Sequence, residues 1–232
     1  MHSRGALHLV EREPQDFVCC KPHASPVDHA LHNLLQLFRR ESDGHWFTPQ
    51  ESAALMRNLR KFPEPFEEPV FQSYHARSDP DSFHFLPSGS VGIPPVAAVY
   101  LALAQRYAKD HSWKTPEDAH FWCLMGDSEF REGSLLECLP DVAERALSNV
   151  TWIIDYNRQN LDGTRIPNER GLRGQDCERI ERTALANGWK VIQLRHGEFR
   201  EQLVERAGGA GLRKLFEGAL SDYEYQMLLL KG

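Results

Sequence analysis

The sequence predicts an α/β protein with a mostly parallel sheet and helices on both faces of it. Two short apolar runs, residues 120–125 and 150–154, are rich in aromatic and β-branched residues, as expected of strands that are covered on both faces. Between these runs, apolar residues recur at helical spacing from Leu135 to Leu147. A strand, a helix and a second strand in this order form a right-handed parallel crossover.

The elements before this crossover continue the alternation. Residues 16–20 are the expected first strand, and an amphipathic helix is expected through residues 31–38. A second helix is predicted to begin at Thr48, because Thr48 and Glu51 have the spacing of a capping box and Pro49 suits the first helical position.

Longer segments complete the expected order of elements. Residues 62–95 hold much of the proline, so we expect a long loop there, followed by a buried alanine-rich helix over 96–107. After the crossover we expect a polar loop over 163–175, a helix over 177–186 and a strand over 191–194. The remainder is expected to be mostly helical.

Polar side chains follow directly after each of the two apolar runs. Ligands of parallel α/β sheets bind beyond the carboxyl ends of the strands, and Mg²⁺ prefers carboxylates, neutral oxygens and phosphates. Asp127 offers a carboxylate, Asn157 an amide oxygen and Gln159 a side-chain or main-chain carbonyl, while Gly126 allows a tight turn and close approach of a diphosphate. The sequence therefore indicates a site for Mg²⁺ and a diphosphate. A strand-end turn and a polar loop without a ligand are the alternative for either half alone.

The pattern Gly-Asp-x-Glu at Gly126, followed by Asn-x-Gln-x-Leu-Asp-Gly at Asn157, resembles the thiamine diphosphate motif of the transketolase-like enzymes. The resemblance is closest to the homodimeric-type pyruvate dehydrogenase E1 component, whose second motif half reads the same. Four more segments resemble this family in the same order, and they lie at residues 21–26, 87–94, 187–192 and 221–226. The resemblance thus covers nearly the whole chain.

This resemblance implies the family's thiamine diphosphate-binding fold, of the PP type, with thiamine diphosphate and Mg²⁺ as cofactors. It implies ligation of Mg²⁺ by Asp127, Asn157 and Gln159. Cofactor contacts are implied for these three residues and for His23, Ser90, Gly92, Ile93, Gly126, Ser128 and Glu129.

The resemblance also implies catalytic roles for two histidines, His23 and His75, in proton handling or carbonyl polarisation. The alternative for His23 is a loop histidine satisfied by its neighbours, and the alternative for His75 is a surface or packing role.

The sequence departs from the family pattern at one motif residue and in its expected domain content. Ser128 stands where the family usually has the second glycine of Gly-Asp-Gly, and its Cβ is tolerable if the local φ is negative or the turn adjusts. Residues 1–232 are expected to form one cofactor-binding domain without the family's front segment and without its pyrimidine-binding and C-terminal domains. A second subunit that carries the pyrimidine-binding domain and the activating glutamate is therefore expected, in a hetero-oligomer of the α2β2 type.

The function implied is that of a cofactor-anchoring subunit of a split enzyme. Such an enzyme cleaves a small 2-oxo acid such as pyruvate, or a ketose, and transfers the two-carbon or acyl unit. The alternative is a non-catalytic, shortened paralogue that acts as a scaffold or regulatory partner. A nucleotide-binding protein of another class is disfavoured, because the sequence has neither a GxGxxG nor a GxxxxGK[ST] loop.

The amino-acid composition excludes several other classes of protein. The chain has 232 residues, 41% of them hydrophobic, and a formal net charge of −6, so it can bury a substantial core and offers no broad basic surface for nucleic acid or anionic lipid. The sequence has no run that resembles a membrane span or secretion signal, so we expect a cytoplasmic protein. The five cysteines lack paired CxxC spacing, which argues against a disulfide framework or a zinc site.

Overall fold

The computed structural model describes residues 16–21, 25–40, 43–57, 91–158, 176–195 and 197–216, with residues 220, 224, 227 and 228. The chain divides into two compact units, Met1–Asp155 and Tyr156–Gly232.

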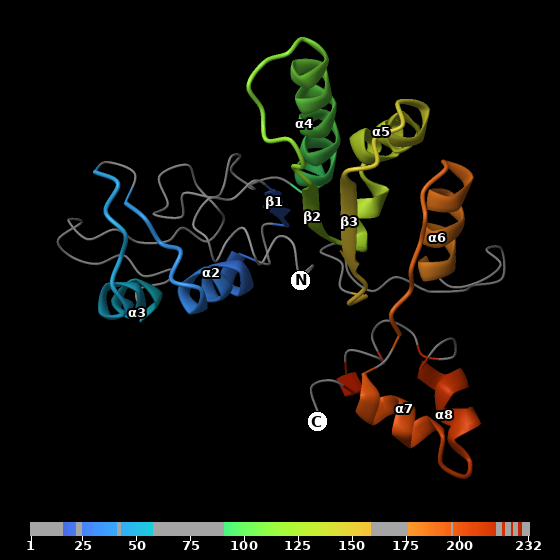
Figure 1. Ribbon diagram of the computed structural model, residues 1–232. Helices are drawn as coiled ribbons and strands as arrows, with labels where there is room; N and C mark the ends of the chain where they lie inside the picture. Colours follow the sequence, from blue (N-terminus) through green and yellow to red (C-terminus); the bar gives the residue numbers. More distant parts are fainter. Residues whose placement is uncertain are drawn as a thin grey trace. The chain divides into compact units, whose positions relative to one another are not determined.

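The first unit contains a parallel sheet. Its strands are β1 (Phe17–Cys20), β2 (Phe121–Gly126) and β3 (Val150–Asp155), in the order β1-β2-β3 (Figure 1). β1 pairs with β2 and β2 pairs with β3, both in parallel, and Gly126 is in register with Asp155. The predicted α/β class, the parallel sheet and the crossover between residues 121 and 155 are therefore confirmed. All carboxyl ends of the described strands lie at one edge of the sheet.

Helix α4 (Ile93–Asp110) contacts all three strands. Its buried face consists largely of small side chains, including Ala98, Val99 and Ala102, which allow the helix to lie close to the sheet. The helix predicted over 96–107 is therefore confirmed. It begins earlier than predicted because prolines occupy its first turn, where a missing N–H removes no helical hydrogen bond.

The crossover consists of the short helix η2 (Ser128–Arg131) and helix α5 (Gly133–Glu144). Alternate residues of β2 are fully buried, and they pack in a core with apolar residues of the crossover; the core includes Phe121, Cys123, Met125, Phe130, Leu135 and Leu139. β3 is less buried than predicted, since most of its residues are only partly covered and Ile153 is exposed.

Helices α2 (Ser25–Leu34) and α3 (Pro49–Arg57) lie in contact with each other. The helix predicted through residue 38 ends at Leu34, because Gln36 has a φ of 55° and turns the chain out of the helix. Phe38 is buried beyond this turn and belongs to a cluster with Phe47.

The predicted capping box at the start of α3 is confirmed by two hydrogen bonds. The backbone N–H of Thr48 donates to Glu51 Oε2 at 2.8 Å, and the backbone N–H of Glu51 donates to Thr48 Oγ1 at 3.3 Å. Each residue thus satisfies a donor that the first helical turn leaves without a helical partner.

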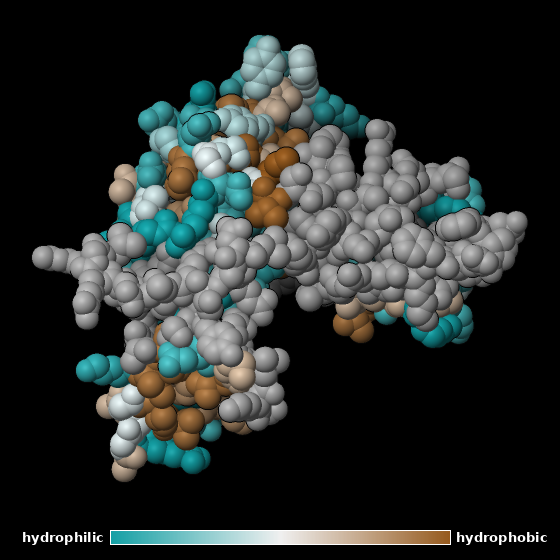
Figure 2. Space-filling view, turned by 180° about the vertical axis from the view of Figure 1, so that it is seen from behind, coloured by the Kyte–Doolittle hydropathy of each residue, from teal (hydrophilic) through white to brown (hydrophobic). Residues whose placement is uncertain are grey.

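The described part of the second unit contains the helices α6 (Asp176–Ala186), α7 (Glu198–Val204) and α8 (Gly209–Lys214). The strand predicted over 191–194 is wrong, because residues 189–195 form neither helix nor strand. Ile192 and Leu194 are 85% and 94% exposed, and the described residues of this unit include no strand with which they could pair. Hydrophobic side chains also cover much of the visible face of α7 and α8 at the lower left of Figure 2.

Several expectations fall outside the described residues. They are the greater part of the loop predicted over 62–95 and the whole of the loop predicted over 163–175. Among the described helices, none combines the length and the apolar character that crossing a membrane requires.

Candidate functional site

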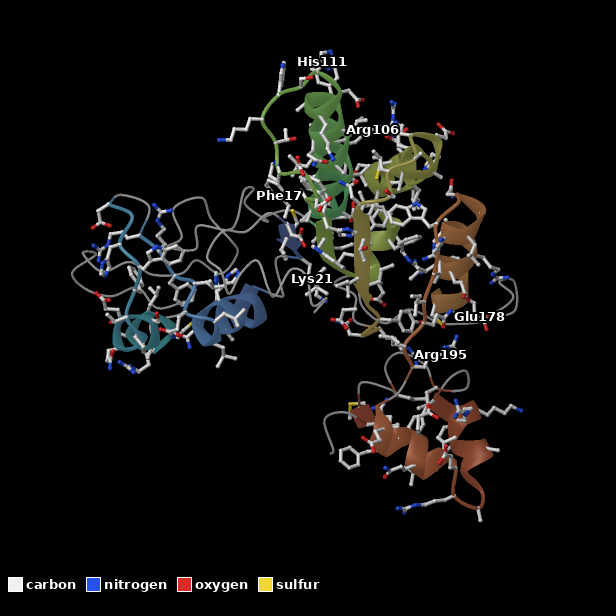
Figure 3. The ribbon with its side chains drawn as sticks, viewed as in Figure 1. Phe17, Lys21, Arg106, His111, Glu178 and Arg195 are labelled. Carbon is white, nitrogen blue, oxygen red and sulfur yellow. The ribbon has the colours of Figure 1, made fainter. Side chains whose placement is uncertain are left out.

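The candidate site lies at the carboxyl edge of the sheet. Lys21 follows β1 directly, Asp127 follows β2, and Asp155 is the last residue of β3. The ladder continues past the ends of the strands, since Lys21 N–H donates to the carbonyl of Leu124 at 2.6 Å and Asp127 N–H donates to that of Asp155 at 3.3 Å. In Figure 3, Phe17 and Lys21 mark the two opposite ends of β1. The backbone therefore holds these three chain segments next to one another.

The carboxylate of Glu129 connects two parts of this edge. Glu129 is 3% exposed, and its Oε1 accepts the backbone N–H of Gly126 at 3.1 Å. Its Oε2 accepts the backbone N–H of Gly92, also at 3.1 Å. Gly92 is the N-cap of α4, so one buried side chain ties the start of α4 to the end of β2. Hydrogen bonds to an ionised carboxylate are stronger than neutral ones.

Gly92 is required by its own geometry. It has a φ of 82°, and a Cβ built on it would lie 2.5 Å from Cγ of Glu132. A left-handed φ favours glycine, and this contact leaves no space for a side chain.

The turn at Gly126 does not depend on glycine, in contrast to the sequence-based expectation. It is not among the residues with positive φ. An added Cβ would meet Glu129 Oε1 at 3.6 Å and the Lys21 side chain at 3.8 Å, which are ordinary contacts. The tight turn predicted for Gly126 does not require a glycine, so close approach of a ligand remains the reason to expect one.

Asp127 and Ser128 lie between β2 and the turn that carries Glu129. Asp127 is 2% exposed and has a φ of −61°. Ser128 begins η2 and does not have a positive φ. The condition for tolerating a serine at this position is therefore met.

Lys21 and Asp155 form an ion pair with 2.6 Å between Nζ and Oδ2. The Lys21 side chain is 9% exposed and that of Asp155 is 47% exposed. Sequence reasoning assigned no role to either residue. The available signal was position, because each of them stands at the carboxyl end of an expected strand.

The remaining predicted site residues are distributed as follows. Ile93 is the exposed first residue of α4. Asn157 follows β3 by two residues and belongs to the second unit, where it is partly buried. His23, His75, Ser90 and Gln159 lie outside the described residues.

Arg158 anchors the segment that carries Asn157 within its own unit. Arg158 has a φ of 59°, and its guanidinium donates to the carbonyl of Leu220 at 2.7 Å. The structure thus brings Gly92, Gly126 and Glu129 together, and the roles predicted for the site residues stay predictions.

In the described part of the chain, no group of three or more His, Cys, Asp or Glu side chains could hold a metal ion. The predicted Mg²⁺ set contains a single carboxylate, that of Asp127. Its other oxygens come from Asn157 and Gln159.

Three of the described cysteines, Cys123, Cys138 and Cys177, have thiols with raised pKa values. Burial raises the pKa of the Cys123 thiol well above its ordinary value, and it raises the pKa of Cys138 to about 11. Burial also raises the pKa of Cys177. A thiol with a raised pKa stays protonated at neutral pH.

Sequence comparison relates the chain to known enzymes. It is 30% identical over 158 residues to the pyruvate dehydrogenase E1 component of Corynebacterium glutamicum, an alignment that covers 68% of this chain and 16% of that protein. It is 31% identical over 212 residues to the pyruvate dehydrogenase E1 component of Mycobacterium tuberculosis, which covers 91% of this chain and 20% of that protein. The chain is a relative of the pyruvate dehydrogenase E1 components. The resemblance predicted from the motifs is thereby confirmed.

The alignments cover only part of these relatives. A third one, with the pyruvate dehydrogenase E1 component of Buchnera aphidicola subsp. Baizongia pistaciae, is 27% identical and covers 96% of this chain but 22% of that protein. The chain therefore spans about a fifth of the length of the curated relatives that it matches. No family model matches it.

Proposed function

We propose that this chain binds thiamine diphosphate and Mg²⁺ and forms the cofactor-anchoring part of an enzyme that cleaves a 2-oxo acid such as pyruvate, or a ketose. The enzyme transfers the two-carbon or acyl unit that results. The observation that carries the proposal is the buried Asp127 at the carboxyl end of β2, beside the bridge from Glu129 to Gly92 and Gly126. The relatives' names support the enzyme class.

The chemistry of the donors fits the proposed cofactors. A carboxylate at the carboxyl end of a parallel strand has the ligand type and the position that Mg²⁺ with a diphosphate favours. Asp127 supplies it, and in the proposal Asn157 and Gln159 add neutral oxygens from the segment that follows β3. Neither Gly92 nor Gly126 carries a side chain that would keep phosphate oxygens away from the backbone.

The first turn of α4 supplies few N–H donors to an anion. The N–H of Gly92 is bound by Glu129, and Pro94 and Pro95 have no N–H. The positive end of the helix dipole remains, but a helix terminus binds phosphate chiefly through its N–H groups. We therefore expect the diphosphate to be held mainly through Mg²⁺, so that cofactor binding depends strongly on the metal.

Each side chain then has a defined task. When bound, thiamine diphosphate would supply the nucleophilic carbon for addition to a carbonyl and the electron sink for cleavage of a carbon–carbon bond. Asp127, with Asn157 and Gln159, fixes the metal, while Glu129 holds the backbone at Gly92 and Gly126. We assign proton handling or carbonyl polarisation to His23 and His75.

A partner subunit is part of the proposed function. The chain spans about a fifth of its relatives' length. We propose that a pyrimidine-binding domain with the activating glutamate acts together with this chain, as a second subunit of an α2β2-like assembly.

Calorimetry tests the proposal directly. The chain is titrated with thiamine diphosphate in the presence and absence of Mg²⁺, and again after addition of the polypeptide that carries the pyrimidine-binding domain. Binding that requires Mg²⁺, in either mixture, supports the proposal. Absence of binding in both mixtures would contradict it and would favour the non-catalytic scaffold.

A further inference from the structure

Lys21 is the basic side chain that reaches across the carboxyl edge of the sheet. It begins at the end of β1, passes within van der Waals distance of the Cβ position of Gly126, and ends at Asp155 of β3. It thus crosses the end of the central strand, directly before Asp127. Figure 3 shows Lys21 at this lower end of the strands.

Stability alone gives a weak reason for this lysine. Removing an ammonium group from water is unfavourable, and a buried ion pair is often no more stabilising than apolar residues of similar volume. The Lys21 side chain is nine-tenths buried. A lysine buried to this extent is uncommon unless it is paired, and its place at the ligand-binding edge of the sheet makes it a candidate for a functional role.

The surroundings of Lys21 are acidic. Asp127, Glu129 and Asp155 place three carboxylates at the described carboxyl edge, and these repel an anionic ligand. The ammonium of Lys21 opposes that repulsion at the point where ligands of parallel sheets bind.

Asp155 is suited to exchange its partner. Its side chain is about half exposed, so water can solvate the carboxylate when Lys21 turns to another anion. The ammonium is a compact point charge on a flexible stem with rotatable donors, which permits such a change of partner.

We infer that Lys21 binds an anionic oxygen group of the ligand, either a phosphate of the cofactor or the carboxylate of the 2-oxo acid, and that Asp155 holds the ammonium in place while the site is empty. This inference rests on the proposed function, and it adds to it a residue that recognises the negative charge of the ligand. The ion pair with Asp155 is then a resting arrangement and not the purpose of the lysine.

The test compares two substitutions in the full chain. Lys21→Met keeps the length and apolar stem of the side chain but removes the charge, while Asp155→Asn leaves the ammonium in place and removes the negative charge of its resting partner. Each variant and the wild type are titrated with inorganic diphosphate plus Mg²⁺, with thiamine diphosphate plus Mg²⁺, and with pyruvate at saturating thiamine diphosphate. Pyruvate binding is followed by saturation-transfer NMR.

We expect Lys21→Met to weaken the binding of one of these anions by about tenfold or more, as expected for loss of a hydrogen bond to a charged group. Weaker binding of both diphosphate probes assigns the phosphate, and weaker binding of pyruvate alone assigns the carboxylate. Asp155→Asn is expected to bind the same anion as tightly as the wild type or more tightly, since the ammonium no longer has to leave a partner. The double variant Lys21→Met/Asp155→Asn leaves neither charge unpaired and should lose the same binding, so it replaces Lys21→Met if that variant does not fold.

Two results would overturn the inference while the proposed function stands. One is unchanged binding of all three probes by Lys21→Met when the wild type binds them. The other is an equal loss in Lys21→Met and Asp155→Asn, which would make the ion pair structural. If the wild type binds none of the probes, the proposed function fails and this inference fails with it.

Discussion

Glu129 and Gly92 are 37 positions apart in the chain, and a hydrogen bond of 3.1 Å joins the carboxylate of one to the backbone N–H of the other. The same carboxylate accepts the N–H of Gly126. The start of α4 and the end of β2 are therefore fixed to each other by a side chain that the sequence places inside the cofactor motif.

Glu129→Gln is expected to destabilise the fold. A carboxamide has one acceptor oxygen instead of two, so one of the two buried N–H groups loses its partner. An unsatisfied buried donor costs about 1–3 kcal/mol, which urea unfolding measures. Glu137→Gln, at an exposed position of α5, is the matched control and should remain within about 0.5 kcal/mol of the wild type. Equal stability of the two variants would show that the Glu129 bridge contributes nothing.

Gly92→Ala is expected to lower the free energy of unfolding by more than about 1 kcal/mol. Alanine at this position would have to adopt the left-handed φ, and its Cβ would lie 2.5 Å from Cγ of Glu132. The control is Gly133→Ala, where an added Cβ meets nothing within 4 Å and the residue lies in a helix. Thermal unfolding of both variants gives the comparison. A Gly92→Ala protein as stable as Gly133→Ala would refute the geometry at Gly92.

Gly126→Ala should separate binding from folding. The added Cβ makes only ordinary contacts with Glu129 and Lys21, so thermal unfolding should be nearly unchanged. If a diphosphate approaches this backbone closely, the methyl group should weaken the binding of thiamine diphosphate by about tenfold or more, as loss of a hydrogen bond to a charged group does. Wild-type affinity in a stably folded variant would remove Gly126 from the cofactor contacts.

The capping box of α3 predicts a pH dependence of stability. The backbone N–H of Thr48, then the Thr48 hydroxyl and the His45 ring, lower the pKa of Glu51 from 4.5 to about 2. Because the pKa is lower in the folded state, the contribution of Glu51 is complete above pH 4.5 and is lost as the pH falls toward 2.

The measurement is the difference in melting temperature between the wild type and Glu51→Gln at several pH values. The difference should be largest near neutral pH and should shrink between pH 4.5 and pH 2. A difference that stays constant over this range would show that the ionised carboxylate has no part in the cap.

Local patterns in the sequence predicted the elements that depend on local interactions. The capping box joins Thr48 and Glu51, which are only three positions apart in the chain. The strand β2 was predictable from its own apolar and aromatic residues. The position of Asp127 at a strand end followed from these elements, because parallel strands share one edge for their carboxyl ends.

Contacts between distant residues were not predictable in this way. The Lys21–Asp155 pair joins residues 134 positions apart, and only the register of three strands brings them together. The strand expected over 191–194 failed for the related reason that alternating apolar residues form a strand only beside a partner. The early end of α2 depends on the left-handed φ of Gln36. Glutamine is not a residue type from which a left-handed φ would be predicted.

The central claim is that Asp127 anchors Mg²⁺ and, through it, the diphosphate. Calorimetry with thiamine diphosphate and Mg²⁺ on Asp127→Asn, which keeps the shape of the side chain and removes its charge, tests this claim most directly. Asp110→Asn, at the exposed last residue of α4, is the control for loss of one negative charge. We predict that Asp110→Asn retains wild-type affinity and that Asp127→Asn loses Mg²⁺-dependent binding while its melting temperature shows a folded protein. Unchanged Mg²⁺-dependent affinity in a folded Asp127→Asn protein would contradict the account.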